Sequence, residues 1–237
     1  MMELQFAVAK ISKYATSESG DTLEMIERPH GGISMVLVDG QRSGRAAKAI
    51  SNVVARKAVQ LLAEGVRDGA AARAAHDYLF TYRGGKVSAT LNILSADIQS
   101  RTIVVSRNNP APVIVHTAAD GLYLLDEPSD VVGFHRNVKP TIAEVPLIVG
   151  TLVVAYTDGL QHAGGFSPAD RLNPANIVRA LLAEGVFEPK AIVDRLLDEA
   201  VILDKGRPRD DISVMSMAVL EGSGEEPRRL NGRLPLS

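Results

Sequence analysis

Short runs of apolar residues near the start of the chain have the period of β-strands. Alternating or continuous apolar positions predict strands over residues 4–10, 22–28 and 33–40. The third run, ISMVLVDG, is apolar almost without interruption until its last two residues, which is typical of a strand buried on both faces. We therefore expect this strand at the centre of a sheet or sandwich.

Two helices are predicted after these strands. Apolar residues recur at helical spacing between Ser43 and Glu64, with Ser43 as the capping residue. An alanine-rich stretch over residues 68–83 predicts a second helix with Asp68 as its N-cap. We expect His76 to be a half-exposed residue of this helix without a role as a ligand.

The middle of the chain contains strands only. Six apolar runs, separated by turn residues such as Asn109-Pro110, predict antiparallel strands. Their ranges are 87–97, 102–108, 112–117, 121–126, 141–147 and 151–157. Two further helices, over 174–184 and 189–203, precede a last strand over 211–220.

The order of these elements separates the fold classes. Strands, two helices, a block of strands, two helices and one strand indicate α+β layers, because a doubly wound parallel sheet would alternate strands with helices. Two packed antiparallel sheets leave two outer faces, and each helix pair can cover one of them. We therefore expect a four-layer α-β-β-α sandwich over residues 1–220, and a flexible tail over 221–237 that is rich in Gly, Pro, Arg and Glu.

Composition narrows the functional classes. The chain has 237 residues, 46% of them hydrophobic, which is enough for one large domain. The absence of cysteine excludes disulfides and thiolate metal sites, and it fits a reducing compartment. A net charge of −2 argues against nucleic acid or an anionic membrane as the partner, and no segment has the pattern of a membrane span or a signal peptide. We expect a cytoplasmic protein.

Four Asp-Gly dipeptides differ in their surroundings. Asp120-Gly121 lies between strand-like residues and fits a hairpin turn, and Asp68-Gly69 joins two helices. Asp39-Gly40 and Asp158-Gly159 instead follow apolar strands and close no obvious hairpin. Each of these two dipeptides therefore places a carboxylate at the end of a buried strand.

Two more predicted strands carry aspartates at their starts. Asp21 opens the strand over 22–28, and Asp210 and Asp211 open the last strand. Carboxylates that converge in a buried place repel each other and need a counter-charge. Aspartate oxygens without His or Cys suit hard divalent cations such as Mg²⁺ or Mn²⁺. The residues alone leave a second interpretation open, in which the four strand ends are solvated turns.

The same motifs resemble the metal-dependent serine/threonine protein phosphatases of type 2C. The resemblance is closest to the bacterial branch that contains the stage II sporulation protein E phosphatase domain and the stressosome-linked regulators. It extends from about Leu4 to Leu220 and follows the order of the family's motifs. The matching stretches are SGD at 19–21, VLVDGQRSGRAA at 36–47, SATLNIL at 88–94, RNNPAPVIV at 107–115, LVVAYTDGL at 152–160 and RDDISVMSMAV at 209–219.

The resemblance implies an α-β-β-α sandwich with two divalent ions, Mn²⁺ or Mg²⁺, at one edge. Asp39 would bridge the two ions, and Asp211 would be an alternate or supporting ligand beside the direct ligand Asp210. Catalysis would proceed through a metal-bound water that attacks phosphorus without a protein nucleophile, with Asp39, Asp158 and Asp210 as the catalytic residues. The full set of implied metal-binding residues is Asp21, Asp39, Gly40 through its carbonyl, Asp158, Asp210 and Asp211.

The segment after Asp39-Gly40 departs from the family pattern because it contains additional arginines. Arg42 and Arg45 could bind the substrate phosphate or an acidic partner, or they could be solvated at a helix start. His162 could protonate the leaving oxygen, or it could lie near the site by accident. The arginine that holds phosphate in eukaryotic relatives has no evident counterpart before Asp21.

The resemblance implies hydrolysis of phosphoserine or phosphothreonine on a regulatory protein, such as an anti-sigma-factor antagonist or a stressosome partner. Two other hypotheses were weighed. A nucleotide or small-phosphate hydrolase is disfavoured because the chain lacks the G-x-x-x-x-G-K-[ST] and G-x-G-x-x-G patterns. A catalytically silent binding module would have lost metal-binding aspartates, and the implied ones are all present. We expect a monomer or weak homodimer that binds neither nucleic acid nor membrane.

Overall fold

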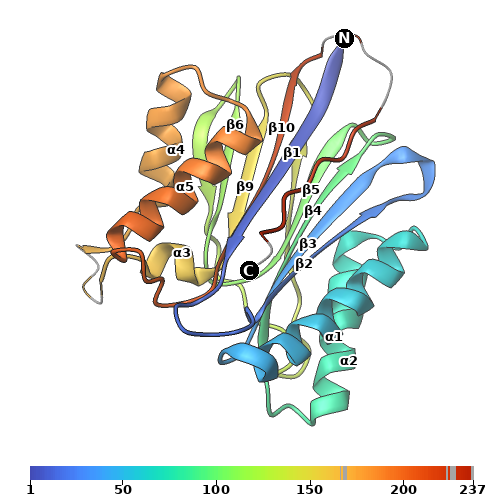
Figure 1. Ribbon diagram of the computed structural model, residues 1–237. Helices are drawn as coiled ribbons and strands as arrows, with labels where there is room; N and C mark the ends of the chain where they lie inside the picture. Colours follow the sequence, from blue (N-terminus) through green and yellow to red (C-terminus); the bar gives the residue numbers. More distant parts are fainter. Residues whose placement is uncertain (166, 168–169, 223, 225–227, 236–237) are drawn as a thin grey trace.

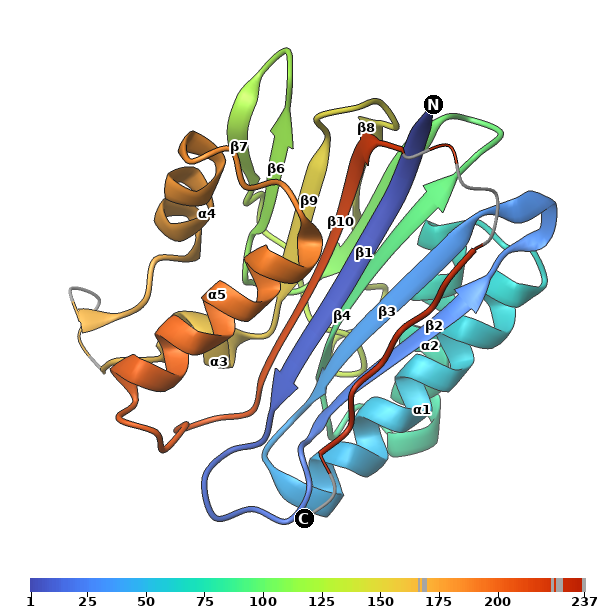
Figure 2. The same ribbon diagram turned by 45° about the horizontal axis from the view of Figure 1, so that its top comes forward.

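The computed structural model describes residues 1–165, 167, 170–222, 224 and 228–235. Within these residues, two five-stranded antiparallel sheets pack face to face, and helices cover both outer faces (Figure 1). Figure 2 shows the same four layers from a second direction, with one helix layer on each side of the paired sheets. The predicted α-β-β-α sandwich is therefore confirmed.

The first sheet contains both ends of the folded domain. Its strands, in spatial order, are β1 (Met2–Ile11), β10 (Ile212–Glu221), β9 (Leu152–Tyr156), β6 (Val113–Thr117) and β7 (Gly121–Leu125). The helices on its outer face are α3 (Asp158–His162), α4 (Pro174–Ala183) and α5 (Pro189–Leu203). All neighbouring strands of this sheet are antiparallel.

The second sheet is built mainly from consecutive strands. Its spatial order is β2 (Asp21–Glu27), β3 (Ile33–Gly40), β4 (Ala89–Asp97), β5 (Thr102–Asn108) and β8 (Thr141–Pro146). A single 3-10 turn, η1 (Pro29–Gly31), lies between β2 and β3. The outer face is covered by α1 (Gly44–Ala63) and α2 (Asp68–Arg83), which are inserted between β3 and β4.

Strand β3 explains why a central strand is apolar almost throughout. Met35 and Leu37 pack against the other sheet, whereas Val36 and Val38 pack against the helices. Alternate side chains of a strand point to opposite faces, so a strand between a helix layer and a second sheet has no solvated face. The uninterrupted apolar run in the sequence is the direct consequence.

Local details differ from the expectations at two helical positions. Asp68 is the first residue of α2 rather than its N-cap, which is Arg67, and its carboxylate bonds to Arg28 and Ser95 instead of the helix. His76 is buried, not half-exposed, and its Nδ1 accepts a hydrogen bond of 3.0 Å from the Gly133 amide. Burial lowers the pKa of His76, which keeps the ring neutral and able to accept.

The expected tail begins where β10 ends, at Glu221. Residues 223, 225–227 and 236–237 of this tail lie outside the described residues. Arg228 makes an ion pair of 3.6 Å with Glu27 at the end of β2. No helix in the described part of the chain is both long and apolar enough to span a membrane.

Candidate functional site

Strand ends from both sheets meet at one edge of the sandwich. Asp21 at the start of β2 lies directly opposite Asp39 at the end of β3. In the other sheet, the Thr157 amide donates to the Ser213 carbonyl, and the Ser213 amide donates to Thr157 Oγ1, each over 3.0 Å. These bonds hold the end of β9 beside the start of β10. The four strand ends that carry aspartates therefore lie near one another.

Asp21 links the two sheets through its side chain. Its Oδ2 accepts hydrogen bonds from Ser213 Oγ at 2.6 Å and from Thr157 Oγ1 at 3.1 Å, both of which belong to the other sheet. Its Oδ1 is buried and has no hydrogen-bond partner. Burial raises the pKa of Asp21 to about 6, although the two hydroxyl groups favour the charged form. Among the described residues, no hydrogen-bond donor therefore reaches this Oδ1.

Asp39 is the carboxylate whose ionisation is disfavoured most by its surroundings. Burial, as the largest cause, and the negative charges of Asp21, Asp158 and Asp210 together raise its pKa to about 9. These three residues come from β2, α3 and the segment before β10. The four carboxylates are thus close enough to repel one another, and they cannot all ionise without a positive counter-charge.

A cavity of about 370 Å³ opens at this edge. Asp39, Gly40, Asp158 and Asp210 all contribute to its lining, together with Lys13. Burial raises the pKa of Asp210, and the charge of Lys13 lowers it. The cavity therefore combines a cluster of carboxylates with at least one cation at its wall.

Asp211 has a different environment from Asp210. Its Oδ1 accepts from the Lys13 amide at 2.9 Å, and its Oδ2 accepts from the Gly20 amide at 2.8 Å. Asp211 therefore fixes both ends of the segment between β1 and β2, and it holds Lys13 against the cavity. This arrangement favours Asp210 as the open carboxylate and Asp211 as its support, and the assignment of direct ligands stays a prediction.

The two strand-end Asp-Gly dipeptides require glycine for close packing. A Cβ on Gly40 would lie 2.1 Å from the Ala47 carbonyl oxygen of α1, and a Cβ on Gly159 would lie 2.1 Å from the Asp211 carbonyl oxygen. Gly121 differs, because it has φ +68° and open space around it, as in a hairpin turn. At 40 and 159, glycine brings backbone and carboxylates together.

Two lysines that the sequence did not single out converge on Asp21. Lys10 Nζ on β1 and Lys48 Nζ on α1 each donate to the Asp21 carbonyl oxygen over 2.7 Å. Burial lowers the pKa of Lys10, and the neighbouring Lys48 lowers it further. The available signal was a lysine inside the apolar alternation of β1, which is unusual for a strand that packs against a helix layer. Lys13 was also missed, because it lies in an irregular segment.

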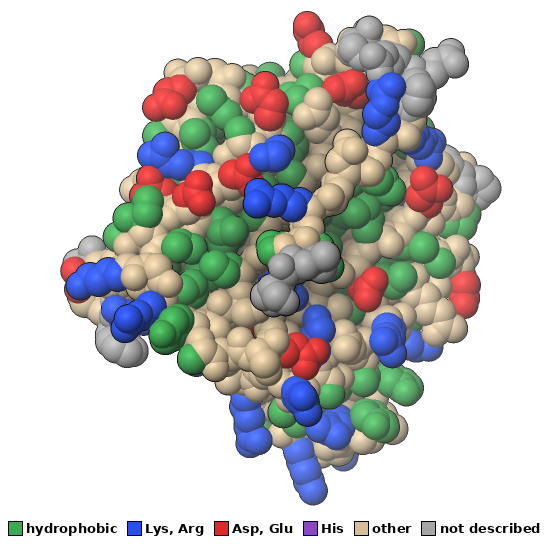
Figure 3. All heavy atoms as spheres, viewed as in Figure 1, with side chains coloured by type: hydrophobic (Ala, Val, Ile, Leu, Met, Phe, Trp, Pro, Cys, Tyr) green, Lys and Arg blue, Asp and Glu red, His purple; other side chains and the backbone are tan. Residues whose placement is uncertain are grey.

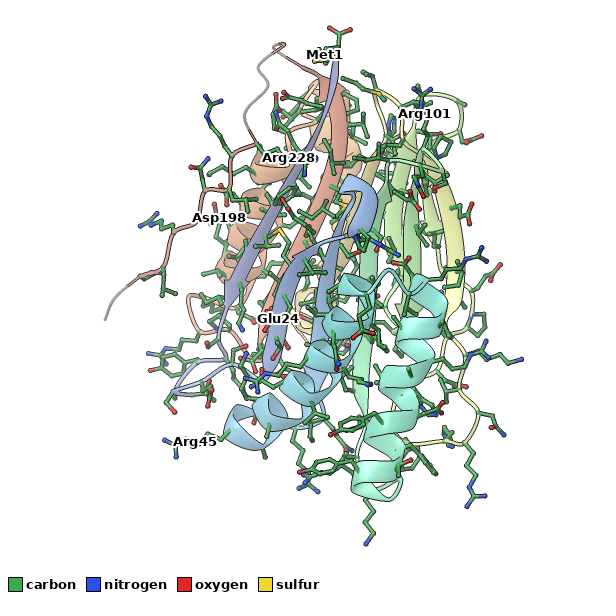
Figure 4. The ribbon with its side chains drawn as sticks, turned by 90° about the vertical axis from the view of Figure 1, so that its right-hand side faces the viewer. Met1, Glu24, Arg45, Arg101, Asp198 and Arg228 are labelled. Atoms are coloured by element: carbon green, nitrogen blue, oxygen red, sulfur yellow. The ribbon has the colours of Figure 1, made fainter. Side chains whose placement is uncertain are left out.

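The structure places the two predicted arginines and the predicted histidine in different environments. Arg42 lines the cavity and has φ +80°, a left-handed backbone that non-glycine residues rarely adopt. Arg45 is exposed in the first turn of α1 and points away from the ribbon in Figure 4, and it is not among the described residues that line the cavity. His162 Nδ1 lies 3.7 Å from Asp158 Oδ2, with nearly half of its side chain exposed.

The donor set was tested for its fit to a divalent cation. Among the described residues, no three His, Asp or Glu side chains are arranged so that they could hold a metal ion. The chemistry of the donors nevertheless fits a hard cation, because Asp21 Oδ1 is buried without a partner and Asp39 is surrounded by like charges.

Comparison with known proteins identifies the family. The family model described as stage II sporulation protein E (SpoIIE) matches residues 29–220. The chain belongs to the SpoIIE family. The match includes β3, β9 and β10, and therefore the aspartates at 39, 158, 210 and 211. The comparison with curated proteins gave no match.

Solved structures share the fold of this SpoIIE-family chain. The PP2C phosphatase domain of Bacillus subtilis SpoIIE with a regulatory fragment has a TM-score of 0.79 at 18% identity, covering 91% of this chain and 63% of that one. The SiaA PP2C domain of Pseudomonas aeruginosa has a TM-score of 0.73 at 15% identity, covering 90% and 85%. The RsbU and RsbW domains of a Mycobacterium tuberculosis protein have a TM-score of 0.70 at 20% identity, covering 92% and 60%. The chain thus has the PP2C fold and spans less than two thirds of two of these chains.

Two other structures with this fold contain divalent metals. The catalytic domain of the serine/threonine phosphatase PstP was solved with two manganese ions, with a TM-score of 0.69 at 15% identity and coverage of 93% and 100%. RsbX was solved with magnesium, with a TM-score of 0.68 at 15% identity and coverage of 92% and 100%. Two proteins that share this fold thus bind divalent metals.

Proposed function

We propose that this chain is a Mn²⁺- or Mg²⁺-dependent phosphatase that hydrolyses phosphoserine or phosphothreonine on a regulatory protein. The observation that carries the proposal is the gathering of Asp39, Asp158 and Asp210, from both sheets, around one cavity, with the buried Asp21 close enough to Asp39 to raise its pKa. Within a fold whose other members were solved with Mn²⁺ or Mg²⁺, this cluster has the donors for the same ions.

Each side chain at the cavity has a proposed task. Asp39 and Gly40 line the cavity from β3, where Asp39 would hold both ions and the Gly40 carbonyl would help to hold the second. Asp158 and Asp210 would bind the first ion, and Asp21 would act on the side of the second through its unpartnered Oδ1. Asp211 would keep the loop of Lys13 in place through its two amide hydrogen bonds.

Positive charge at the cavity wall would bind the substrate phosphate. Lys13 and Arg42 both line the cavity, and their cations attract a phosphomonoester dianion. When bound, divalent ions at such a site supply the charge that activates water for attack on phosphorus and offsets the developing charge. The protein part of the catalysis is then positioning and charge balance, in agreement with the absence of cysteine.

The family and the structurally similar proteins support a class of partner for this chain. One relative carries RsbU and RsbW domains in one chain, and another structure belongs to a study of the bacterial stressosome. These relationships support a phosphorylated protein of a partner-switching or stressosome-type pathway as the substrate of this chain.

Turnover of p-nitrophenyl phosphate tests the chemistry. We expect the wild-type protein to hydrolyse this ester with Mn²⁺ and to lose activity with EDTA. Asp39→Asn removes the carboxylate at the centre of the cluster, and we expect kcat/KM to fall by about 100-fold or more. Circular dichroism and a thermal melt of the variant check that the fold is retained. Turnover that persists in EDTA would overturn the mechanism.

One observation favours a second candidate, a catalytically silent binding module. In the part of the chain that the structure describes, no three acidic or histidine side chains are arranged to hold an ion. Calorimetric titration with Mn²⁺ and Mg²⁺ separates the two candidates. Absence of binding and of turnover with both metals, together with binding of a phosphopeptide, would favour the silent module.

A further inference from the structure

Cations gather beside the cavity on the side of α1. The segment 42–57 contains no Asp or Glu, although the whole chain has a net charge of −2. Its cations are Arg42, Arg45, Lys48, Arg56 and Lys57. In Figure 3, Lys and Arg side chains gather at the lower end of the molecule, where Figure 1 draws the start of α1 and the end of α2. An electropositive surface therefore adjoins the candidate site.

Two of these cations lie where local physics disfavours them. Arg45 is in the first turn of α1, at the positive end of the helix dipole, and no acidic residue is present in that turn. Arg42 has a left-handed backbone at φ +80°. Local costs of this kind beside a cavity indicate that the cations serve binding rather than folding.

Exposed tyrosines on α2 are paired with cations. Tyr78 and Tyr82 stack with ring centroids 6.0 Å apart, and their exposed fractions are 48% and 61%. Lys57 Nζ lies 5.9 Å from the Tyr78 ring centroid, and the Arg83 guanidinium lies 5.8 Å from that of Tyr82. We call these four residues the tyrosine–cation patch. Exposed Tyr and Arg held in place by cation–π contacts are typical of the residues that dominate protein interfaces.

The patch is joined to the rim of the cavity through the segment after α2. The Gln41 amide donates to the Ser88 carbonyl at 3.0 Å, and the Ser88 amide donates to Gln41 Oε1 at 3.3 Å. Both residues line the cavity, and Ser88 follows Arg83 by only five residues. The end of α2, which carries part of the patch, is therefore followed within a few residues by a segment of the cavity wall.

A third tyrosine–cation pair lies on another part of the rim. The Arg207 guanidinium is 5.2 Å from the ring centroid of Tyr14, and Tyr14 is 55% exposed. Tyr14 directly follows Lys13, which lines the cavity. The loop is fixed by the Tyr14 amide, which donates to the Pro208 carbonyl at 2.8 Å. The remaining tyrosines, Tyr123 and Tyr156, are less exposed, so each of the exposed tyrosines has a cation beside its ring.

We propose that the tyrosine–cation patch docks an acidic protein surface that surrounds the phosphorylated serine or threonine. The inference rests on the proposed function and adds the chemistry by which the substrate protein is chosen. Charge complementarity defines the partner, because a phosphate of about −2 charge with neighbouring carboxylates matches this surface. Small esters occupy the cavity alone, so the patch contributes selection among phosphoproteins and not the bond-breaking step.

The test compares charge reversal on the patch with charge reversal elsewhere. Lys57→Glu combined with Arg83→Glu changes the patch without touching a residue that lines the cavity. Lys190→Glu combined with Arg195→Glu is the matched control, because both cations are exposed on α5. The substrates are p-nitrophenyl phosphate, a phosphothreonine peptide flanked by Asp and Glu, and the same peptide flanked by Ser and Gly.

We expect the patch variant to lose about tenfold in kcat/KM with the acidic peptide. Its turnover of p-nitrophenyl phosphate should stay within about twofold of wild type, and the control variant should change neither substrate. The preference of the wild-type protein for the acidic peptide should also fall as salt is raised from 50 to 500 mM, since exposed charges are screened. An equal loss with both peptides, or no loss with the acidic one, would overturn the inference.

A binding measurement separates this inference from the proposed function. Fluorescence anisotropy of the labelled acidic phosphopeptide reports docking in the Asp39→Asn variant, which is expected to turn over slowly or not at all. If the wild-type protein has no phosphatase activity but binding weakens about tenfold on patch reversal, docking stands and the proposed function fails. Equal affinity for a single-stranded DNA of similar charge would show a general polyanion surface and would overturn the docking proposal.

Discussion

Two buried polar clusters lie at opposite ends of strand β2 and differ in how their charges are balanced. At the end of β2, Arg28 Nη1 forms an ion pair of 2.7 Å with Asp68, and its Nη2 donates to the Val66 carbonyl at 3.0 Å. Ser95 donates to the other oxygen of Asp68 and bonds to Ser34 at 2.6 Å. Every charge in this cluster has a partner within the chain.

The cluster at the start of β2 has the opposite character. Asp21 has one buried oxygen without a partner, and Asp39 has its pKa raised by burial and by three neighbouring carboxylates. Hydroxyl groups donate to the carboxylate of Asp21, and lysines donate to its backbone carbonyl. Among the described ion pairs, none joins a cation to Asp39. Both clusters are buried and polar, so burial alone does not separate a structural network from a functional site. Charge that the chain leaves uncompensated distinguishes the candidate functional site from the structural network.

The largest expected effect concerns the compensated cluster. Asp68→Ala leaves the Arg28 guanidinium buried without its counter-ion, and we expect a loss of about 3–5 kcal/mol in the free energy of unfolding. Urea denaturation at pH 7 measures it. Asp77→Ala on the same helix is the control, because 69% of that side chain is exposed, and it should cost under about 0.5 kcal/mol. Equal effects of the two substitutions would contradict the structural role of the Arg28 cluster.

A second prediction concerns the glycine that brings the uncompensated cluster together. Gly40→Ala would place a methyl group 2.1 Å from the Ala47 carbonyl oxygen, so the start of α1 must move. We expect a loss of about 3 kcal/mol, and weaker stabilisation by Mn²⁺ in a thermal melt. Gly121→Ala is the matched Asp-Gly control, with a cost of about 1 kcal/mol from its φ of +68° and unchanged metal response. A normal metal response in Gly40→Ala would show that the dipeptide has no role in the site.

The smallest expected effect is the pH dependence of the metal-free protein. The ordinary pKa of 3.8 for Asp39 rises to about 9 in the fold, so the folded state keeps a proton that the unfolded state has lost between these values. The contribution of Asp39 to stability is therefore fully present below its ordinary pKa of 3.8 and is lost as the pH rises toward 9. In EDTA, we expect the melting temperature to fall by about 5 °C between pH 5 and pH 9.

A neutral isostere checks the origin of this slope. Asp39→Asn carries no charge to repel the other carboxylates, so its melting temperature in EDTA should vary less with pH than that of the wild type. Added Mn²⁺ should stabilise the wild type more at pH 8 than at pH 5, because a cation offsets ionised carboxylates. An identical dependence of melting temperature on pH in both proteins would show that the ionisation of Asp39 does not cause it.

Most of the architecture could be predicted because it depends on local periodicity. The strand over 102–108 and the helix over 189–203 have the predicted bounds, and the other predicted strands and helices agree within about two residues. The short helix α3, which starts at Asp158, was not predicted, because five residues carry too little periodicity. The order of elements also predicted the four layers, since each amphipathic face needs a partner.

The candidate site could be predicted in part. Asp39 and Asp158 were found because each belongs to an Asp-Gly that ends an apolar strand without closing a simple turn. The structure brings both residues, together with Asp210, to one cavity. Lys13 and Lys48 were missed, since nothing in their own neighbourhoods distinguishes them from solvated lysines, and Lys10 was missed although it lies among the apolar residues of β1. Their positions depend on contacts with residues up to 198 positions away, as in the bond from the Lys13 amide to Asp211.

The sequence by itself determined the periods of the strands and helices, the layer order and the positions of acidic strand ends. These properties are local, because each depends on which face of an element its neighbours must bury. Only the tertiary structure decided that Asp68 pairs with Arg28, that His76 is buried and that Asp21 is tied to Ser213. Such contacts join residues far apart in the chain, so their energies depend on how whole sheets pack and cannot be expressed in any short stretch of sequence.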